Sequence, residues 1–258
     1  MQEKNVTEIL SELVKIKSIS SDKNHIADVK KSAEFVEKLF LELGLQTKIA
    51  TSGNSRPAVL AQTEINPDRK TVLLYAHHDV QPVGDINKWE TGPFNPEIIN
   101  GRLFGRGSGD NKAGVVIHHE VVNELMKDLP VNIKIFIEGE EEIGSPCMAE
   151  FLDEFNKELE ADVIVIADSG NIRIGTPTVT TSLRGLVDGF IEVDQPMRPV
   201  HSGVSGGVVP DAFMVLSKII ASFHNEKGEL QIEGLTSSDM DVLELKEEEI
   251  KKIFGSED

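Results

Sequence analysis

The sequence changes from apolar to polar within LLYAHHDVQP, residues 73–82. The apolar half predicts a buried strand, and the polar half begins where that strand should end. Further acids follow other apolar runs, at Asp110, at Glu141 and Glu142, and at Asp168. Because an α/β sheet delivers such side chains to one ligand crevice, we expect them to meet at one edge of a sheet.

Apolar runs and helical patterns alternate on both sides of this stretch. Helical spacing predicts helices near Val6–Leu13, Ala33–Leu43, Ala113–Met126 and Met148–Leu159. Short apolar runs predict strands at Ala58–Ala61, Thr71–Tyr75, Val131–Ile137 and Asp162–Ala167. This alternation predicts an α/β fold, with a mostly parallel sheet that is covered by helices on both faces.

The pattern changes beyond about residue 178. Gly185–Val193 alternates apolar and polar residues, which favours a strand, whereas Ala212–Phe223 and Leu243–Phe254 favour amphipathic helices. We therefore expect a first domain over residues 1–178 and part of a smaller α+β domain over residues 179–258.

Composition excludes several classes of protein. The 258 residues include 44 acids against 26 lysines and arginines, a formal charge of −18 that repels nucleic acid and anionic lipid. The single Cys147 cannot form an internal disulfide, no export signal is visible, and the apolar runs are too short to cross a bilayer. These features predict a cytoplasmic protein with neither a nucleic-acid nor a membrane partner.

The histidine of the central stretch is a candidate metal ligand. Side chains at i and i+2 lie on one side of an extended chain, so Asp79 can hydrogen-bond a ring nitrogen of His77. Imidazole and carboxylate suit zinc, manganese or cobalt, and a shared carboxylate can hold two such ions. The acids of residues 138–142 repel one another unless cations neutralise them, and one of them could then act as general base. Each motif alone is also compatible with a solvated histidine–acid pair or an acidic surface turn.

The segment GRGSGDNKAG, residues 105–114, permits two interpretations. It is rich in glycine and precedes a helix, as phosphate-binding loops do. It lacks the Gly-Lys-Ser/Thr ending of a P-loop, and it does not follow the first strand as a dinucleotide-binding turn would. The glycines instead favour a tight turn that brings Asp110 beside His77.

The motifs also form an ordered set. In chain order they are Tyr-x-His-x-Asp-Val-Gln-Pro from Tyr75, Trp89 with Gly92-Pro93-Phe94, Leu103–Ser108 with Asp110 and Lys112, Glu138-Gly139 with Glu141-Glu142 and Gly144-Ser145, Asp168, and His201-Ser202-Gly203 with Gly206-Gly207. This set resembles the dinuclear zinc metallopeptidases that include carnosinase-like dipeptidases, aminoacylases, acetylornithine deacetylase and succinyl-diaminopimelate desuccinylase. The likeness is closest to the dipeptidase branch.

The resemblance implies a role for each site residue. It implies His77 and Asp168 on one metal ion, Asp110 bridging two ions, Glu142 on the other ion, Glu141 as general base and Asp79 orienting His77. The ions would be two divalent cations, zinc first, with manganese or cobalt as alternatives. A cis peptide bond would follow Asp110. His201 would belong to the lid and help to stabilise the oxyanion, often in the partner subunit's active site.

The resemblance also implies the domain roles and the extent of the chain. Residues 1–178 would be the N-terminal part of the catalytic metal-binding domain, and residues 179–258 would be part of a lid and dimerisation domain. Family members are roughly twice as long, and their chain returns from the lid to complete the sheet and to supply a final histidine ligand. We therefore expect the C-terminal parts of both domains to be absent here and the second metal position to be weak. Homodimerisation is a family expectation.

The activity implied is metal-dependent hydrolysis of dipeptide amide bonds, with a small peptide as substrate. Two alternatives remain at this stage. One is an amidase of the same family that removes an acyl group from an amino acid. The other is a catalytically inactive fragment that binds metal.

Overall fold

The computed structural model describes residues 5–171, 174–181, 183, 185–194, 201–235, 246, 248 and 251. The chain divides into two units, Met1–Asn171 and Ile172–Asp258. The assignment of catalytic and lid domains, with a boundary after residue 178, stays a prediction.

A five-stranded sheet in the order β1-β2-β6-β3-β7 forms the centre of the first unit. The strands are β1 Gln46–Ala50, β2 Ala58–Gln62, β3 Thr71–His77, β6 Asn132–Glu138 and β7 Val163–Ile166. β3 pairs in parallel with β6 and with β7, whereas β2 is antiparallel to both β1 and β6. Only β2 runs against the others, so the prediction of a mostly parallel sheet is confirmed. β1 was not predicted.

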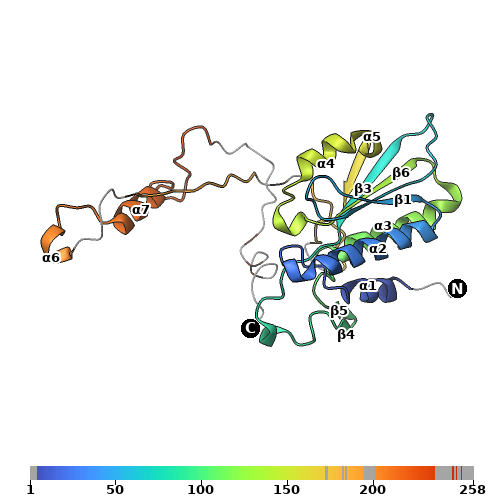
Figure 1. The fold of residues 1–258 in the computed structure, drawn as a ribbon, viewed down its shortest axis with the longest axis horizontal. Helices are drawn as coiled ribbons and strands as arrows, with labels where there is room; N and C mark the ends of the chain where they lie inside the picture. Colours follow the sequence, from blue (N-terminus) through green and yellow to red (C-terminus); the bar gives the residue numbers. More distant parts are fainter. Residues whose placement is uncertain are drawn as a thin grey trace. The chain divides into compact units, whose positions relative to one another are not determined.

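Helices cover both faces of this sheet (Figure 1). α1 Val6–Val14, α2 Ile26–Glu42 and α3 Lys112–Leu125 lie on one face, and α4 Met148–Glu154 and α5 Asn156–Leu159 lie on the other. Alternation along β2 explains the two layers, because Val59 and Ala61 pack among α1–α3 whereas Leu60 packs with α4 and α5. The predicted α/β fold with two helical layers is therefore confirmed.

Local sequence explains how several helices begin and end. Asn5 and Glu8 form a reciprocal capping box at the start of α1. Gly44, with φ of +89°, follows α2 as the predicted stop. The single helix predicted over Met148–Leu159 is interrupted at Phe155, whose ring packs 4.6 Å from that of Phe151, measured between ring centroids. The helix is interrupted where these two aromatic rings pack together, and helical periodicity in the sequence does not predict this interruption.

The remaining elements of the first unit are short. A hairpin of β4 Glu97–Ile99 and β5 Arg102–Phe104 and four 3₁₀ turns, η1 Lys23–His25, η2 Ile86–Lys88, η3 Met126–Asp128 and η4 Glu141–Ile143, complete it. The η4 turn begins three residues after the end of β6 and carries two of the predicted site residues, Glu141 and Glu142.

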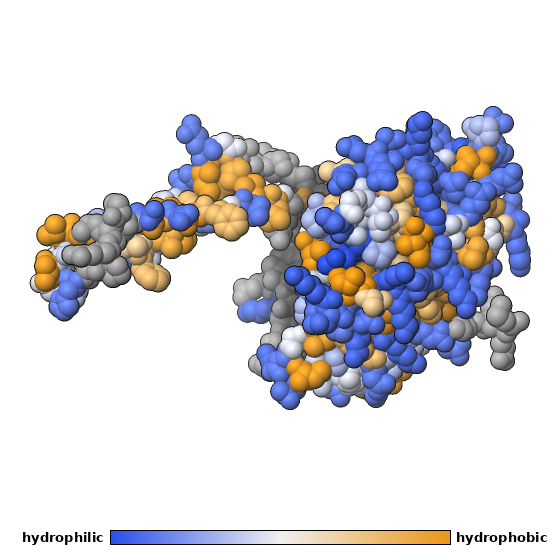
Figure 2. All heavy atoms as spheres, in the orientation of Figure 1, coloured by the Kyte–Doolittle hydropathy of each residue, from blue (hydrophilic) through white to orange (hydrophobic). Residues whose placement is uncertain are grey.

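The second unit contains α6 Ser202–Ser205 and α7 Ala212–Ala221. The predicted helix at Ala212 is confirmed, and hydrophobic residues are exposed on this unit (Figure 2). The strand predicted over Gly185–Val193 is wrong, because the described residues there form no ladder with another strand and an alternating pattern alone cannot supply the missing hydrogen bonds. The helix predicted over Leu243–Phe254 falls almost wholly outside the described residues.

Candidate metal centre

The parallel core of the sheet brings distant polar residues to one edge. His77 is the last residue of β3 and lies opposite Glu138, the last residue of β6, while Asp168 follows β7 by two residues. Parallel neighbours present their carboxyl ends at the same edge, so these three positions converge. His77 is fully buried there.

The loop before α3 brings Asp110 to the same edge. Gly107 has φ of +84°, and a Cβ at that position would lie 2.6 Å from Val80, so only glycine fits. The Asp110–Asn111 peptide bond is cis. The Asn111 amide donates to the backbone carbonyl of Ala167, at 2.7 Å, and to the Asp168 carboxylate. The start of α3 is therefore tied to the segment that carries Asp168.

One atom from each of His77, Asp110 and Asp168 lies within 4.8 Å of the others. His77 Nε2 is 3.1 Å from Asp110 Oδ1 and 3.8 Å from Asp168 Oδ1. The His77 side chain is fully buried, whereas that of Asp110 is 74% exposed, so the cluster faces solvent on one side. An imidazole nitrogen with two carboxylates is a donor set that fits a divalent cation such as zinc.

Asp79 connects this cluster to the acidic turn. Its Oδ1 lies 3.3 Å from His77 Nδ1, and its two oxygens accept the backbone N–H groups of Glu141 and Glu142, at 3.2 and 3.1 Å. Burial alone would raise the pKa of the Asp79 carboxyl, but the hydrogen bonding and charge of neighbouring His77 outweigh it, so its pKa lies below the ordinary value. A single buried carboxylate thus orients the histidine and fixes the turn.

The electric field at His77 favours a cation. Burial lowers the pKa of His77, but the hydrogen bond and charge of Asp79 and the charges of Asp168 and Glu141 overcome it and raise the pKa to about 9. The surrounding acids therefore stabilise positive charge at the ring, and a metal ion would take the place of that proton.

Glu141 and Glu142 lie in η4 beside the cluster. Glu141 Oε2 is 3.6 Å from His77 Nε2, and burial, with repulsion from Asp168 and Glu142, raises the pKa of Glu141. Burial also raises the pKa of Glu142, whose Oε2 accepts a hydrogen bond from Gln81 at 2.8 Å. Carboxyls with raised pKa values are suited to proton transfer.

Three residues of this edge received no role from the sequence. Asn111 holds Asp168, Gln81 holds Glu142, and fully buried His78 donates from Nε2 to the backbone carbonyl of Pro57, at 2.9 Å. Their positions inside the two quoted motifs were a signal, because residues beside metal ligands commonly orient them.

His201 lies in the second unit, and its imidazole Nδ1 accepts the Gly203 N–H at the start of α6, at 3.1 Å. The role of His201 in oxyanion stabilisation stays a prediction.

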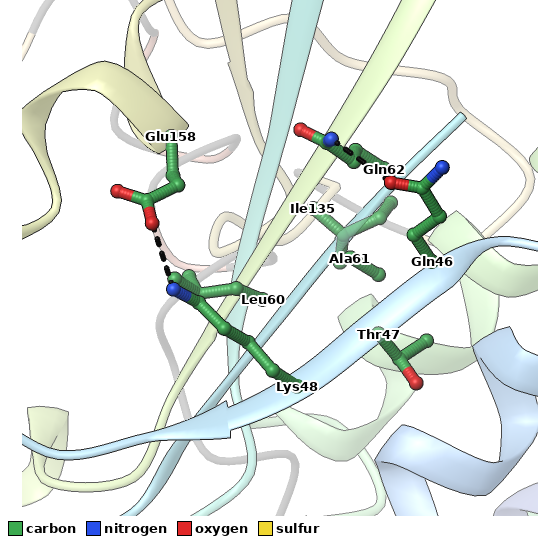
Figure 3. A pocket seen from close by; sticks show the side chains of 8 residues that line it. All are labelled: Gln46, Thr47, Lys48, Leu60, Ala61, Gln62, Ile135 and Glu158. Carbon is green, nitrogen blue, oxygen red and sulfur yellow. Dashed lines mark hydrogen bonds and ion pairs between the residues drawn. The ribbon is translucent and has the colours of Figure 1, made fainter. Parts of the chain in front are cut away.

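The first unit also contains a hollow outside this cluster. A hollow of about 280 Å³ lies over β1 and β2, where Lys48 pairs with Glu158 and Gln62 donates to Gln46 (Figure 3). Its two charged side chains therefore neutralise each other. Among the described residues, no helix combines the length and apolar character needed to span a bilayer.

Comparisons with known proteins show what this chain is similar to. The family described as Peptidase family M20/M25/M40 matches residues 73–257. A cysteinylglycine-S-conjugate dipeptidase of Corynebacterium striatum is 36% identical over 89% of this chain and 51% of its own length, and a Beta-Ala-His dipeptidase of Homo sapiens is 34% identical over 75% of this chain and 39% of its own. The chain spans about half the length of the curated relatives it matches.

Two solved structures share the fold. An M20 family metallo-carboxypeptidase from Sulfolobus solfataricus has a TM-score of 0.77 at 27% identity, over 99% of this chain and 60% of its own. Human carnosine dipeptidase 1 has a TM-score of 0.69 at 26% identity, over 96% of this chain and 57% of its own.

Proposed function

The chain belongs to Peptidase family M20/M25/M40, and from this membership and the metal centre we propose that it serves in metal-dependent hydrolysis of dipeptides. The resemblance found in the sequence is thereby confirmed at the level of the family. The relatives described above include two proteins named as dipeptidases, which supports a small peptide as the substrate class. The alternative of an N-acyl-amino-acid amidase gains no support from them.

The cluster of His77, Asp110 and Asp168 carries the proposal, because its atoms are close enough to share one ion. We assign Asp110 as the bridging ligand and Glu142 to a second ion. Zinc suits this donor set best, with manganese and cobalt as alternatives. Among the described residues we assign three ligands to the first position and two to the second, so we expect the second to be the weaker one.

The chain's own residues supply the remaining chemistry. A divalent ion bound here would polarise a peptide carbonyl and lower the pKa of a water molecule. Glu141, with its raised pKa and its position 3.6 Å from His77, would accept a proton from that water and deliver it to the leaving amine. Asp79 would hold both His77 and the Glu141 backbone in place throughout.

The wider assignments are extensions of the same proposal. We propose that residues 179–258 contribute to a lid in which His201 assists oxyanion stabilisation, that the protein acts as a homodimer, and that it works in the cytoplasm.

Metal uptake and hydrolysis test this function separately. Equilibrium dialysis with Zn²⁺ should give uptake that His77→Ala and Asp110→Ala abolish. Cys-Gly and β-Ala-His hydrolysis should require the metal and should be lost in Glu141→Gln, which keeps its metal. Hydrolysis of an N-acetyl amino acid instead would support the amidase, and uptake without hydrolysis would support the inactive fragment. Zn²⁺ uptake that is unaffected by His77→Ala and Asp110→Ala would refute the site.

A further inference from the structure

Gln81 links the strand that ends at His77 to the acidic turn. Its side-chain Nε2 donates to Glu142 twice, to the backbone carbonyl and to Oε2, each at 2.8 Å. Although the residue is exposed to solvent, its amide therefore fixes both the backbone and the carboxylate of a proposed ligand.

The backbone of Gln81 is anchored on both sides. The N–H of fully buried Val80 donates to the Ser18 carbonyl, at 2.9 Å. On the other side, Arg106 Nη2 donates to the Pro82 carbonyl, at 3.0 Å, and the proline ring restricts φ. The Gln81 side chain therefore starts from a backbone that has little freedom to move.

Glu142 is held from a second direction as well. Its backbone N–H donates to Asp79 Oδ2, at 3.1 Å. Together with Gln81, this fixes the N–H, the carbonyl and one carboxylate oxygen of Glu142. Gln81 engages only Oε2, which leaves Oε1 to meet a cation. A glutamine amide suits this task, because it donates to a carboxylate without adding charge that would oppose a metal ion.

We propose that Gln81 is a positioning residue for the second metal position, where it holds the Glu142 carboxylate in place before the cation arrives. The inference rests on the proposed metal centre and adds to it a determinant of affinity. Without Gln81, the Glu142 side chain would have to give up its rotational freedom when the ion binds, and the ion would bind more weakly.

Zn²⁺ titration calorimetry of the full chain tests this with Gln81→Met, which keeps the length of the side chain and removes the donor. The Glu142-dependent part of uptake, defined by Glu142→Ala, should weaken about 10-fold, as is usual when an outer partner of a ligand is removed. The His77-dependent part should not change. Gln62→Met is the matched control, because it removes a glutamine amide bond to Gln46 (Figure 3), and Gln62 pairs with Lys134, four residues before the end of β6.

A double-mutant comparison separates positioning from a general structural effect. Gln81→Met should change nothing further in the Glu142→Ala background, because the carboxylate through which it acts is gone. An equal loss in both backgrounds, an unchanged affinity in Gln81→Met, or uptake unaffected by Glu142→Ala would each overturn the inference. Refutation of the proposed metal centre would give a different result, because His77→Ala would then leave Zn²⁺ uptake intact.

Discussion

Replacement of Asp79 by alanine gives the sharpest test of how the centre is held together. The Asp79 side chain is fully buried and pairs with three groups, the His77 ring and the backbone N–H groups of Glu141 and Glu142. Alanine would leave both backbone N–H groups without this partner, and His77 Nδ1 would keep only the backbone carbonyl of residue 79, which lies 3.1 Å away. We expect loss of stability even in metal-free protein, because the contacts do not involve the ion.

The magnitude follows from the contacts that are lost. Breaking a buried ion pair by removing one partner typically costs about 3–5 kcal/mol, and each backbone N–H left unsatisfied contributes about 1–3 kcal/mol to such a total. These contributions overlap, so we expect Asp79→Ala to lower the free energy of unfolding by about 3–5 kcal/mol. Asp79→Asn keeps one acceptor oxygen, but its amide NH₂ group would face N–H donors. We expect it to lower the free energy of unfolding by about half as much as Asp79→Ala.

The single tryptophan makes the assay specific to the first unit. Trp89 lies in the loop after β3, with its indole N–H donating to the Val83 carbonyl and the Arg106 guanidinium 5.2 Å from its ring. Its fluorescence in urea, recorded after dialysis against a chelator, should therefore report unfolding of this unit. The transition midpoint should fall without a change in its slope.

Asp162→Asn is the matched control, because Asp162 lies on the same unit and also pairs with a cation and a backbone N–H, those of Lys70 and Thr71, but its side chain is 37% exposed. Its effect should be much smaller than that of Asp79→Asn. If the two asparagine variants unfolded at the same urea concentration, or if Asp79→Ala cost less than about 1 kcal/mol, the account of Asp79 as the organising residue would be wrong.

Three further predictions concern the rest of the first unit. Phe151→Ala should cost about 3–5 kcal/mol in the same urea assay, because the buried ring stacks on Phe136 with centroids 5.2 Å apart; a loss below about 1 kcal/mol would contradict this packing. Asn5→Ala removes the side-chain cap of α1 and should cost about 1 kcal/mol, with faster amide exchange in its first turn, whereas unchanged exchange would contradict the cap. Burial lowers the pKa of His118 below 6.5 in the folded protein. As the pH falls through about 6.5, the unfolded chain therefore takes up a proton on His118 before the folded protein does. The folded state loses stability over this range. Unfolding free energies between about pH 7 and pH 5 should therefore decline less in His118→Gln, and equal slopes would refute this.

Much of the fold could be predicted because its signals are local. Strands β2, β3, β6 and β7 are apolar runs of strand length, and α1 and α2 carry helical spacing. β1 was not predicted, because Gln46–Ala50 is short and half-polar. It forms a strand only through its ladder with β2. The opposite error occurred over Gly185–Val193, where alternation is present and a partner strand is not found among the described residues.

The candidate site divides in the same way. By itself, the sequence determined which donors are present, that His77, Glu141, Glu142 and Asp168 follow apolar runs, and that Asp110 lies in a glycine-rich segment, since residue type and periodicity are properties of neighbouring positions. Only the tertiary structure decided that His77, Asp110 and Asp168 lie within one ion's reach, that Asp79 serves both the histidine and the acidic turn, and that the Gln81 amide reaches Glu142. Apart from the contact of Asp79 with His77, these contacts join residues far apart in the chain, and their distances depend on strand order and side-chain packing, which no local pattern encodes.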